Sequence, residues 1–269
     1  MTNYVLVGCG KMGGALLSGW IERGVPRQSI KVVEPAAAAA RAIGDHYAIE
    51  AVSEASQLPD GLAPDVVIFA VKPQVMADVV PAYRRFVPKA LFASIAAGKP
   101  IGFFEFHLGA EAAIVRTMPN TPAAVHRGIT VACANGCVTA GQRAMCQSLL
   151  EAVGEVAWVE DEALLDPVTA VSGSGPAYVF LMIECLTEAG VKSGLPPELA
   201  ARLARATVAG SGELARQSTE APATLRKNVT SPGGTTEAAL KVLMAGDGLQ
   251  ALLDRAVDAA TRRSRELAG

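Results

Sequence analysis

A glycine-rich stretch near the start of the chain, "YVLVGCGKMGGAL" (4–16), constrains the fold more than any other part of the sequence. The apolar run at 4–7 is typical of a short strand. Three glycines in the spacing G-x-G-x-x-G follow it, and apolar residues then recur at helical intervals. A strand, a tight glycine turn and a helix in this order begin a dinucleotide-binding unit. We therefore expect a cofactor at this turn.

Each glycine of the turn has its own predicted task. Gly8 permits the tight turn, Gly10 lets the backbone approach a pyrophosphate, and Gly13 allows the helix to pack closely on the strand. The N-terminus of the helix attracts the anion. The alternative is a plain strand–helix turn without a ligand. The strand before the turn, the helix after it and the acidic residue that ends the next strand favour a cofactor instead. The residues expected to contact the cofactor here are Val7, Gly8, Gly10, Lys11, Met12 and Gly13.

An acidic residue, Glu34, ends the next strand-like run, "IKVVE" (30–34). A carboxylate at this position can accept hydrogen bonds from both ribose hydroxyls of NAD, and it repels a 2′-phosphate. No arginine follows it before Arg41. The sequence therefore favours NADH, with NADPH still possible. The alternative is that Glu34 is an ordinary solvated acid at a strand end.

The rest of the first half alternates apolar runs with helical patterns. Continuous apolar strands separated by helices indicate a parallel sheet covered on both faces. Right-handed crossovers then give an α/β fold with a Rossmann-type doubly wound sheet. An Ala-rich helix is expected over 36–43, ending at Gly44. Further strands are expected within 65–71, 90–96, 112–118 and 128–134.

Two later loops follow strands of this predicted sheet, "AVKPQ" (70–74) and "AAGKP" (96–100). Ligands of such sheets bind outside the carboxyl ends of the strands. Lys72 can contact a phosphate or a ribose, although a lone lysine is equally consistent with a surface charge. The cofactor residues predicted from these loops are Ala70, Val71, Lys72, Pro73, Ala96, Ala97 and Gly98.

The pattern changes after "EVAWVE" (155–160), where strand-like runs largely stop. The remaining sequence is rich in Ala and Leu at helical spacing, with a helix start at Gly175-Pro176 and an amphipathic segment at 249–267. We therefore predict a dinucleotide-binding Rossmann domain over 1–162 and a helical domain over 163–269.

Composition excludes some classes of partner and favours others. Lys plus Arg is 24 and Asp plus Glu is 26, so the net charge of −2 gives no support for nucleic-acid binding. No run of about 18 apolar residues is apparent, so we expect no membrane partner. The start of the chain lacks a basic leader, which predicts a cytoplasmic location. Charged residues make up 19%, which is consistent with apolar surface hidden between subunits or with an ordinary Ala-rich surface.

The cysteines and histidines form no recognisable metal or disulfide pattern. The five cysteines lack paired spacing, and the three histidines are scattered through the sequence. We expect reduced cysteines and no metal site.

A second glycine stretch, "VTSPGGTTEAAL" (229–240), interrupts the helical second half. Pro232 fixes its own φ, and the two glycines after it can adopt conformations closed to other residues. Successive N–H groups from Gly233 to Thr236 can form an anion-binding nest at a helix N-terminus, which Glu237 can help to cap. The residues alone are also consistent with an ordinary helix–helix turn.

Several motifs together resemble the pyrroline-5-carboxylate reductase family. The most specific are "VTAVSGSGPAY" (168–178), "GVKSGLP" (190–196) and "NVTSPGGTTEAAL" (228–240). The resemblance covers the whole chain, because similar motifs occur in the first half at "AVKP" (70–73), "AAG" (96–98) and "MPNTP" (118–122).

This resemblance implies hydride transfer from a reduced nicotinamide to the C=N bond of 1-pyrroline-5-carboxylate, giving L-proline in the last step of proline biosynthesis. A cyclic imine that protonates near neutral pH supplies its own electrophile, so no strong catalytic acid is required. Thr236 is the implied catalytic residue, through its hydroxyl at the ring nitrogen. Glu162 lies in the acidic run 160–162 and is also consistent with a solvated charge. The implied substrate-binding residues are Glu162, Asn228, Ser231, Gly233, Gly234, Thr235 and Thr236.

The chain departs from the family pattern at Glu34-Pro35. Many members carry Ser or Asn there, often with an Arg, which suits NADPH. The resemblance also implies that the helical domain is a dimerisation domain, in a homodimer or a larger ring of dimers. The alternatives are another imine reductase, a β-hydroxyacid dehydrogenase of the same architecture, or a nucleotide-sensing module without turnover. The lysines of the helical domain stand in no catalytic pattern that would favour the dehydrogenase.

Overall fold

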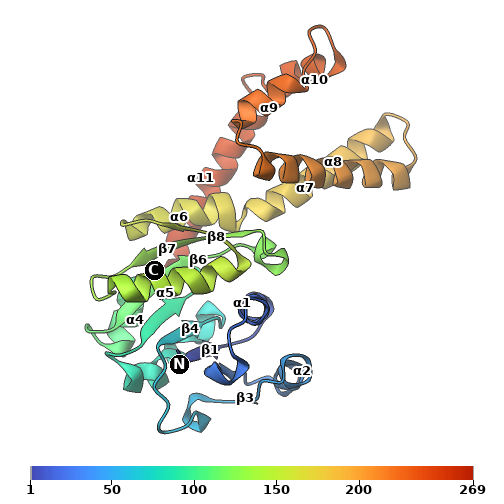
Figure 1. The fold of residues 1–269 in the computed structure, drawn as a ribbon. Coiled ribbons are helices and arrows are strands. Elements are labelled where there is room, and N and C mark those ends of the chain that lie inside the picture. The colour runs from blue at the N-terminus through green and yellow to red at the C-terminus, as the bar shows by residue number, and fades with distance from the viewer. Residues whose placement is uncertain (1, 269) are drawn as a thin grey trace. The chain divides into compact units, whose positions relative to one another are not determined.

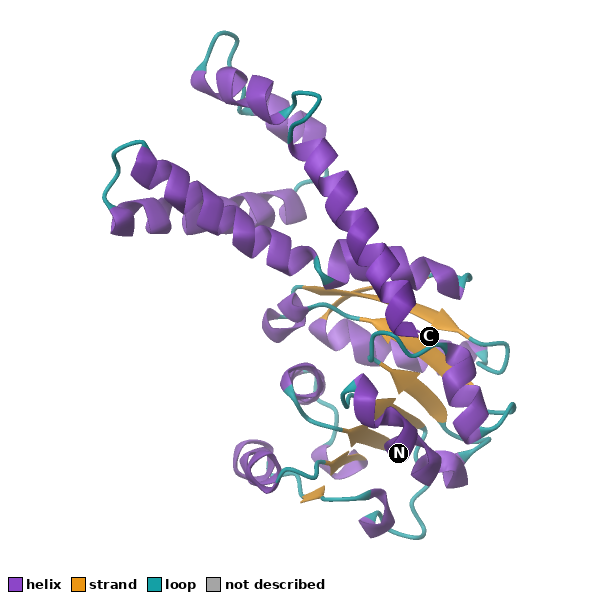
Figure 2. Ribbon diagram, turned by 180° about the vertical axis from the view of Figure 1, so that it is seen from behind, coloured by secondary structure: helices purple, strands orange, loops and turns teal. Residues whose placement is uncertain are grey.

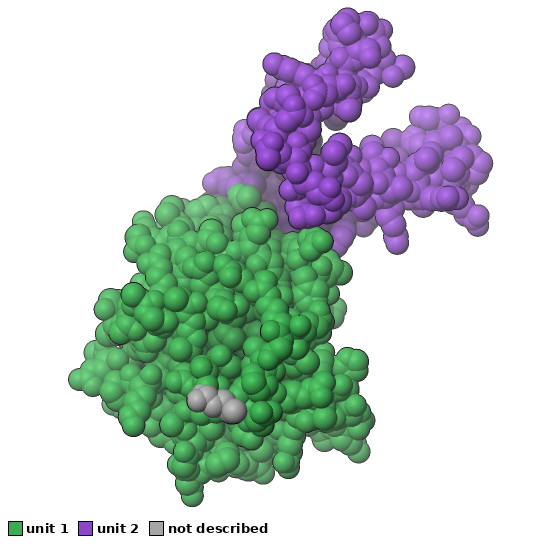
Figure 3. Space-filling view, viewed as in Figure 1, with its two compact units in different colours: residues 1–173, 260–269 green, residues 174–259 purple. Residues whose placement is uncertain are grey.

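The computed structural model describes residues 2–268 and divides into two compact units. Unit 1 comprises 1–173 and 260–269, and unit 2 comprises 174–259 (Figure 3). The predicted boundary at residue 162 follows the last strand, whereas the compact unit continues to residue 173. The reason is packing, because Leu165 and Ala170 are fully buried in unit 1. A change in sequence pattern marks the end of the strands but not the end of the core.

Unit 1 is built on a sheet that has eight strands within the described residues, in the order β3-β2-β1-β4-β5-β6-β7-β8 (Figure 1). Strand β1 lies in the interior of the sheet, with β2 on one side and β4 on the other. The order of the strands reverses there, which is where doubly wound sheets bind ligands. The strands are β1 (Tyr4–Val7), β2 (Ile30–Val33), β3 (Ala51–Val52), β4 (Val66–Phe69), β5 (Leu91–Ser94), β6 (Ala113–Met118), β7 (Gly128–Ala134) and β8 (Gly154–Trp158).

One pair of neighbouring strands differs from the prediction of a parallel sheet. Strands β6 and β7 pair antiparallel, with Thr117 opposite Ala132. Their connection contains only a short 3₁₀ segment, Thr121–Val125. A parallel crossover needs a dozen or more residues, usually with a helix. The short connection therefore forces β7 to return antiparallel, and the sheet is mostly parallel rather than wholly so.

Helices cover both faces of this sheet (Figure 2). The helix predicted to end at Gly44 continues to Tyr47, and the chain leaves it at Ala48, whose φ is 54°. Glycine within a helix costs only about 1 kcal/mol, so it does not by itself end one. The helices of unit 1 are α1 (Lys11–Glu22), α2 (Ala37–Tyr47), α3 (Met76–Val79), α4 (Ile101–Leu108), α5 (Ala140–Leu150) and α6 (Leu165–Val168), with the last part of α11 (Leu249–Ala268).

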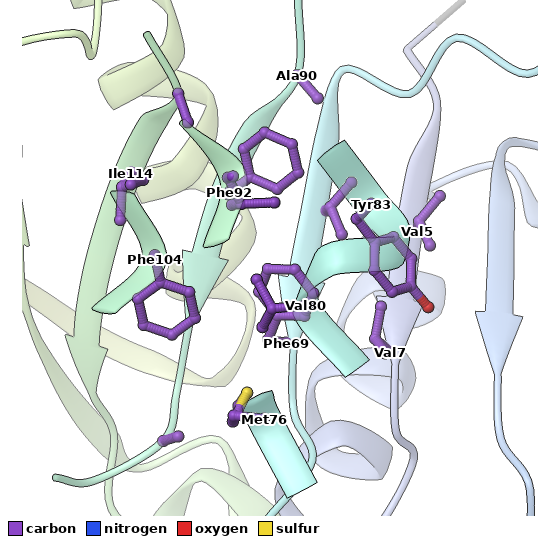
Figure 4. Packing of buried hydrophobic residues seen from close by; sticks show 14 of the residues in the cluster. Val5, Val7, Phe69, Met76, Val80, Tyr83, Ala90, Phe92, Phe104 and Ile114 are labelled. Atoms are coloured by element: carbon purple, nitrogen blue, oxygen red, sulfur yellow. The ribbon is translucent and has the colours of Figure 1, made fainter. Parts of the chain in front are cut away.

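The core consists of two apolar clusters, one on each face of the sheet. Val5 and Val7 point into one cluster and Leu6 into the other, as alternation along a strand requires. In the first cluster the Phe69 ring lies 5.3 Å from the Tyr83 ring, edge to face (Figure 4). The Tyr83 hydroxyl is buried without a partner among the described residues, and its burial raises the pKa of the phenol. Burial on both faces explains why the strands are continuously apolar.

Unit 2 is helical. Helices α7 and α8 approach closely at Gly190, where a Cβ would lie 3.2 Å from the Cβ of Ala200. Helix α7 begins at Gly175, within one residue of the predicted start. The helices are α7 (Gly175–Lys192), α8 (Pro197–Gln217), α9 (Pro222–Asn228), α10 (Thr235–Leu243) and the first part of α11.

Unit 2 exposes many apolar side chains in the single chain. Phe180 is 59% exposed and Val242 is 72% exposed. The helical stretch Glu162–Lys192 is long and apolar enough, by length and composition only, to meet the criterion for a membrane span, and 6% of its most apolar window is buried. The expectation from uninterrupted apolar runs did not register this stretch. The sequence contains no uninterrupted apolar run there, but its average hydropathy is high.

Candidate active site

The first glycine loop has the geometry predicted for its three glycines. Gly8 has φ +87°, and a Cβ there would lie 2.7 Å from Cγ1 of Val71. A Cβ on Gly13 would collide with the carbonyl oxygen of Gly8, so helix α1 packs directly on the turn. Gly10 differs, because a Cβ there would meet nothing within 4 Å. The loop is therefore packed on its protein side and open at Gly10.

The N-terminus of α1 fits an anionic ligand. The N-cap residue Gly10 has no side chain to cap the helix, and no acidic residue lies in the first turn of α1 (Lys11–Glu22). The N–H groups of Lys11, Met12 and Gly13 therefore have no acceptor within the helix. Free donors and the positive end of the helix dipole suit a pyrophosphate. The residues present thus fit the phosphate part of a dinucleotide.

Glu34 is not the solvated acid of the alternative interpretation, since the residue is only 9% exposed. Its Oε2 accepts a hydrogen bond from the Cys9 N–H at 2.8 Å, and its Oε1 accepts from the Ala36 N–H at 2.9 Å. The carboxylate therefore fixes the glycine loop to the end of β2. Burial, with a further effect of the Glu34 charge, raises the pKa of the Cys9 thiol to about 11.

The other predicted cofactor residues follow the neighbouring strands at the same edge of the sheet. Ala70 follows β4, and its N–H donates to the Val7 carbonyl at 2.7 Å. Ala96 follows β5, and its N–H donates to Oγ of Ser94 at 3.2 Å. Because β1, β2, β4 and β5 are parallel, their carboxyl ends meet at one edge. The Lys72 side chain is exposed there.

Glu162 takes part in a partly buried network within unit 1. Its Oε1 accepts hydrogen bonds from Nη1 of Arg116 and from the Ile101 N–H, both at 2.8 Å. Arg116 lies on β6 and is 6% exposed. The alternative of a solvated charge at Glu162 is therefore wrong. The carboxylate instead links Arg116 on β6 to the backbone at the start of α4. Sequence reasoning missed Arg116, although a single arginine inside the apolar run 112–118 was a signal of a buried charge.

The serine-rich motif forms a helical junction. A π-helical turn, Thr169–Gly173, joins α6 to α7. The Ser172 hydroxyl donates to the Val168 carbonyl at 3.0 Å, and Gly173 lies against the methyl group of Met118. π-helical turns are rare and are often found at functional sites. The hydroxyl of Ser172 is occupied by its own helix, which agrees with a packing role rather than a nucleophilic one.

The second glycine loop is exposed and lies in unit 2. Gly233 has φ +71°, and a Cβ there would meet nothing within 4 Å. The Gly234 N–H donates to the Ser231 carbonyl at 3.0 Å, which closes the turn. The Gly233 N–H donates to Oε2 of Glu237 at 2.5 Å. Two of the four predicted anion donors are therefore engaged, which leaves Thr235 and Thr236 in the first turn of α10.

Charged groups support this second loop. The hydrogen bond from Gly233, and then the contact of Lys241 Nζ at 3.2 Å, lower the pKa of the Glu237 carboxyl. Glu237 thus caps Gly233 rather than the N-cap residue Gly234 that the capping pattern predicted. The Asn228 amide donates to Oε2 of Glu220 at 3.2 Å.

The predicted residues thus form two groups. The cofactor residues and Glu162 belong to unit 1, and those from Asn228 to Thr236 belong to unit 2. Among residues 2–268, no three His, Cys, Asp or Glu side chains gather as metal ligands.

Known families match both parts of the chain. Residues 162–267 match the family described as pyrroline-5-carboxylate reductase dimerisation. Residues 3–98 match the family described as NADP oxidoreductase, coenzyme F420-dependent.

Similar proteins match the chain over nearly its full length. A pyrroline-5-carboxylate reductase of Pseudomonas aeruginosa is 44% identical over 99% of this chain and 97% of its own. The solved pyrroline-5-carboxylate reductase of Coxiella burnetii has a TM-score of 0.93 and 36% identity, covering 100% of this chain and 99% of its own. The Plasmodium falciparum pyrroline carboxylate reductase, solved with NADP bound, has a TM-score of 0.83 and 30% identity, covering 100% and 98%. With two glycine loops in the predicted places and these full-length similarities, the chain belongs to the pyrroline-5-carboxylate reductase family.

Proposed function

We propose that this chain reduces the C=N bond of 1-pyrroline-5-carboxylate to give L-proline, completing proline biosynthesis. Membership of the family makes it an oxidoreductase that acts on a C=N bond with a nicotinamide cofactor. The structural observation that carries the substrate assignment is the second glycine loop. It presents the free first-turn N–H groups of Thr235 and Thr236 at the head of α10, in open space beside Gly233.

In this proposal the residues bind and orient two ligands. When bound, the reduced nicotinamide supplies the hydride. The N–H groups of Lys11 to Gly13 hold the pyrophosphate at the head of α1. The N–H groups of Thr235 and Thr236 hold the substrate carboxylate, as does the loop from Ser231 to Gly234, and the Thr236 hydroxyl contacts the ring nitrogen. When the substrate is already an activated imine, orientation of this kind contributes most of the rate enhancement over the uncatalysed reaction.

We also propose that Glu34 makes NADH the preferred cofactor. Both of its oxygens already accept a backbone N–H, yet each keeps a second lone pair for a ribose hydroxyl. A 2′-phosphate at this buried carboxylate would place like charges together. Comparison of kcat/KM with the two cofactors tests this, and a strong preference for NADPH would contradict it. Replacement of Glu34 by Ser is expected to raise kcat/KM with NADPH.

The proposed assembly is a homodimer through the helices of unit 2, within a larger ring of dimers. The exposed apolar side chains of α7 and α8, such as Phe180 and Leu203, are what a subunit interface requires. The match of 162–267 to a dimerisation family supports this. The same interface covers the apolar stretch Glu162–Lys192, so we propose no membrane partner and a cytoplasmic location. Sedimentation as a stable monomer at micromolar concentration would contradict the dimer.

The assay that tests the reaction follows NADH oxidation after 1-pyrroline-5-carboxylate is added. Thr236→Ala is expected to lower kcat about tenfold to a hundredfold, because one hydrogen bond to a charged group is lost. Thr230→Ala is the matched control, since the Thr230 hydroxyl donates to the Arg226 carbonyl at 2.6 Å outside the proposed site. Normal kcat in Thr236→Ala would remove Thr236 from its role. Binding of NADH without oxidation in the wild type would indicate a sensing module instead.

A further inference from the structure

The last turn of α11, Ser264–Leu267, lies against the loop that follows β5. Gly98 is buried in this loop and has φ +70°. A Cβ on Gly98 would lie 3.0 Å from the Leu267 carbonyl oxygen and 3.3 Å from the Leu267 Cβ. Both segments belong to unit 1. The middle of a predicted cofactor loop therefore rests directly on the backbone of the far end of the sequence.

This last turn is anchored independently of the loop. Ser264 is 5% exposed, and its hydroxyl donates to Oδ1 of Asp166 at 2.7 Å. Arg265 Nε lies 3.8 Å from the other carboxylate oxygen of Asp166. Asp166 follows Leu165, which is fully buried in the core on one face of the sheet. A buried hydroxyl on a carboxylate is a strong and specific contact, so it fixes the position of the turn.

The two ends of the same loop are also fixed. At its start the Ala96 N–H donates to Oγ of Ser94 at 3.2 Å. At its end the Ile101 N–H donates to Oε1 of Glu162 at 2.8 Å. Gly98 lies between these two points, and a glycine at positive φ can move more freely than other residues. The contact with Leu267 lies at the middle of the loop, between these two fixed ends.

We propose that the last turn of α11 is a positioning element for the cofactor loop 96–98. Ser264 and Asp166 hold the turn, and the turn holds Gly98 in the conformation that receives the cofactor. The proposal rests on the proposed function, because that function places the cofactor at this loop. A preorganised loop loses less entropy on binding, so release of the turn weakens cofactor binding without touching Thr236.

The first experiment measures steady-state kinetics of the full chain with NADH and 1-pyrroline-5-carboxylate. Ser264→Ala and Asp166→Ala are each expected to raise the KM for NADH about five- to tenfold, with kcat changed less than twofold. Asp166→Asn keeps an acceptor for the Ser264 hydroxyl and is expected to restore a KM near that of the wild type. Arg263→Ala is the matched control, because Arg263 directly precedes the turn and the substitution removes its exposed ion pair with Glu266.

The second experiment tests whether the contact with Gly98 is direct. In the full chain, Gly98→Ala places a methyl group against the Leu267 carbonyl. In the Ser264→Ala background the turn is no longer held, so the Leu267 carbonyl can move away and chiefly the backbone strain at Gly98 remains. The rise in the KM for NADH caused by Gly98→Ala is therefore expected to be smaller in the Ser264→Ala background than in the wild type. Equal effects in both backgrounds would overturn the direct contact.

The outcomes separate this proposal from the proposed function. An active wild type with an unchanged KM for NADH in Ser264→Ala and Asp166→Ala would overturn the positioning role. Similar rises in the KM for NADH and the KM for 1-pyrroline-5-carboxylate, together with a lower kcat and a lower Tm, would also overturn it. That result would indicate general destabilisation of the protein. A wild type that binds NADH but never oxidises it would instead contradict the proposed function.

Discussion

The two glycine loops look alike in sequence but differ in how the protein holds them. At the first loop, Gly8 and Gly13 pack against backbone and side chains on the protein side, and the Glu34 carboxylate fixes Cys9. At the second loop, Gly233 faces open space, and its N–H contacts the exposed Glu237 side chain. The first loop needs glycine chiefly for packing, whereas the second needs it only for backbone conformation.

This difference suggests how each loop serves its ligand. A long dinucleotide contacts many residues, so a rigid cradle built into the sheet suits it. A small imino acid offers one carboxylate and one nitrogen, and a loop with few contacts of its own can adapt to it. Substitutions at the packed glycines of the first loop, Gly8 and Gly13, should therefore change stability, and those in the second loop should change substrate binding more than stability.

The largest expected effect is that of Gly13→Ala. The new methyl group would collide with the Gly8 carbonyl, so we expect a loss of about 3 kcal/mol in the free energy of unfolding. Gly10→Ala is the matched control, because its methyl group meets open space, and it should weaken NADH binding with little loss of stability. Urea denaturation of both variants measures the difference. Similar stability of the two would show that the first loop is not packed as described.

Glu34→Gln is expected to lower the free energy of unfolding by about 2 kcal/mol, because one of two hydrogen bonds to a charged acceptor is lost. The substitution also removes a negative charge beside Cys9. Burial is the larger cause of the raised Cys9 pKa, so the pKa should fall only part of the way toward its ordinary value of 9.0.

Alkylation of Cys9 by iodoacetamide at pH 9, followed by mass spectrometry, measures that fall in pKa. The rate is expected to increase in Glu34→Gln, since a lower pKa gives more thiolate. The exposed Cys185 serves as an internal control in the same sample. If the Cys9 rate and the Cys185 control rate are both unchanged in Glu34→Gln, the contact between Glu34 and the loop is contradicted.

Gly233→Ala tests the second loop. A positive φ costs a residue with a side chain about 1 kcal/mol, and the open space adds no collision. The KM for 1-pyrroline-5-carboxylate is expected to rise more than stability falls. Gly210→Ala is the control, because Gly210 lies inside α8 with open space around it, where Ala is expected to be neutral or stabilising. A large loss of stability in Gly233→Ala with an unchanged KM for 1-pyrroline-5-carboxylate would contradict this contrast, because the second loop would then need its glycine for packing.

The sequence predicted much of the fold because local patterns determine it. The apolar strands, the glycine turn and the amphipathic α11 depend on neighbouring residues, and all lie where expected. The antiparallel β7 was missed because the length of a connection, not the strand pattern, decides direction. Contacts between distant residues were also missed. Ser264 and Asp166 lie far apart in the chain, and neither carries a local signal of the hydrogen bond between them.

The smallest expected effect concerns Glu237 and tests whether its charge supports the second loop. Its pKa lies below the ordinary value of 4.5, so the ionised form is stabilised in the folded chain. That contribution is fully present above pH 4.5 and is lost as the pH falls through the lowered pKa. Glu237→Gln keeps an acceptor for Gly233 but has no charge. The Tm of the wild type should therefore exceed that of Glu237→Gln slightly at pH 7, and the gap should close as the pH is lowered toward 3. A gap that persists in acid would mean that the contact does not depend on charge.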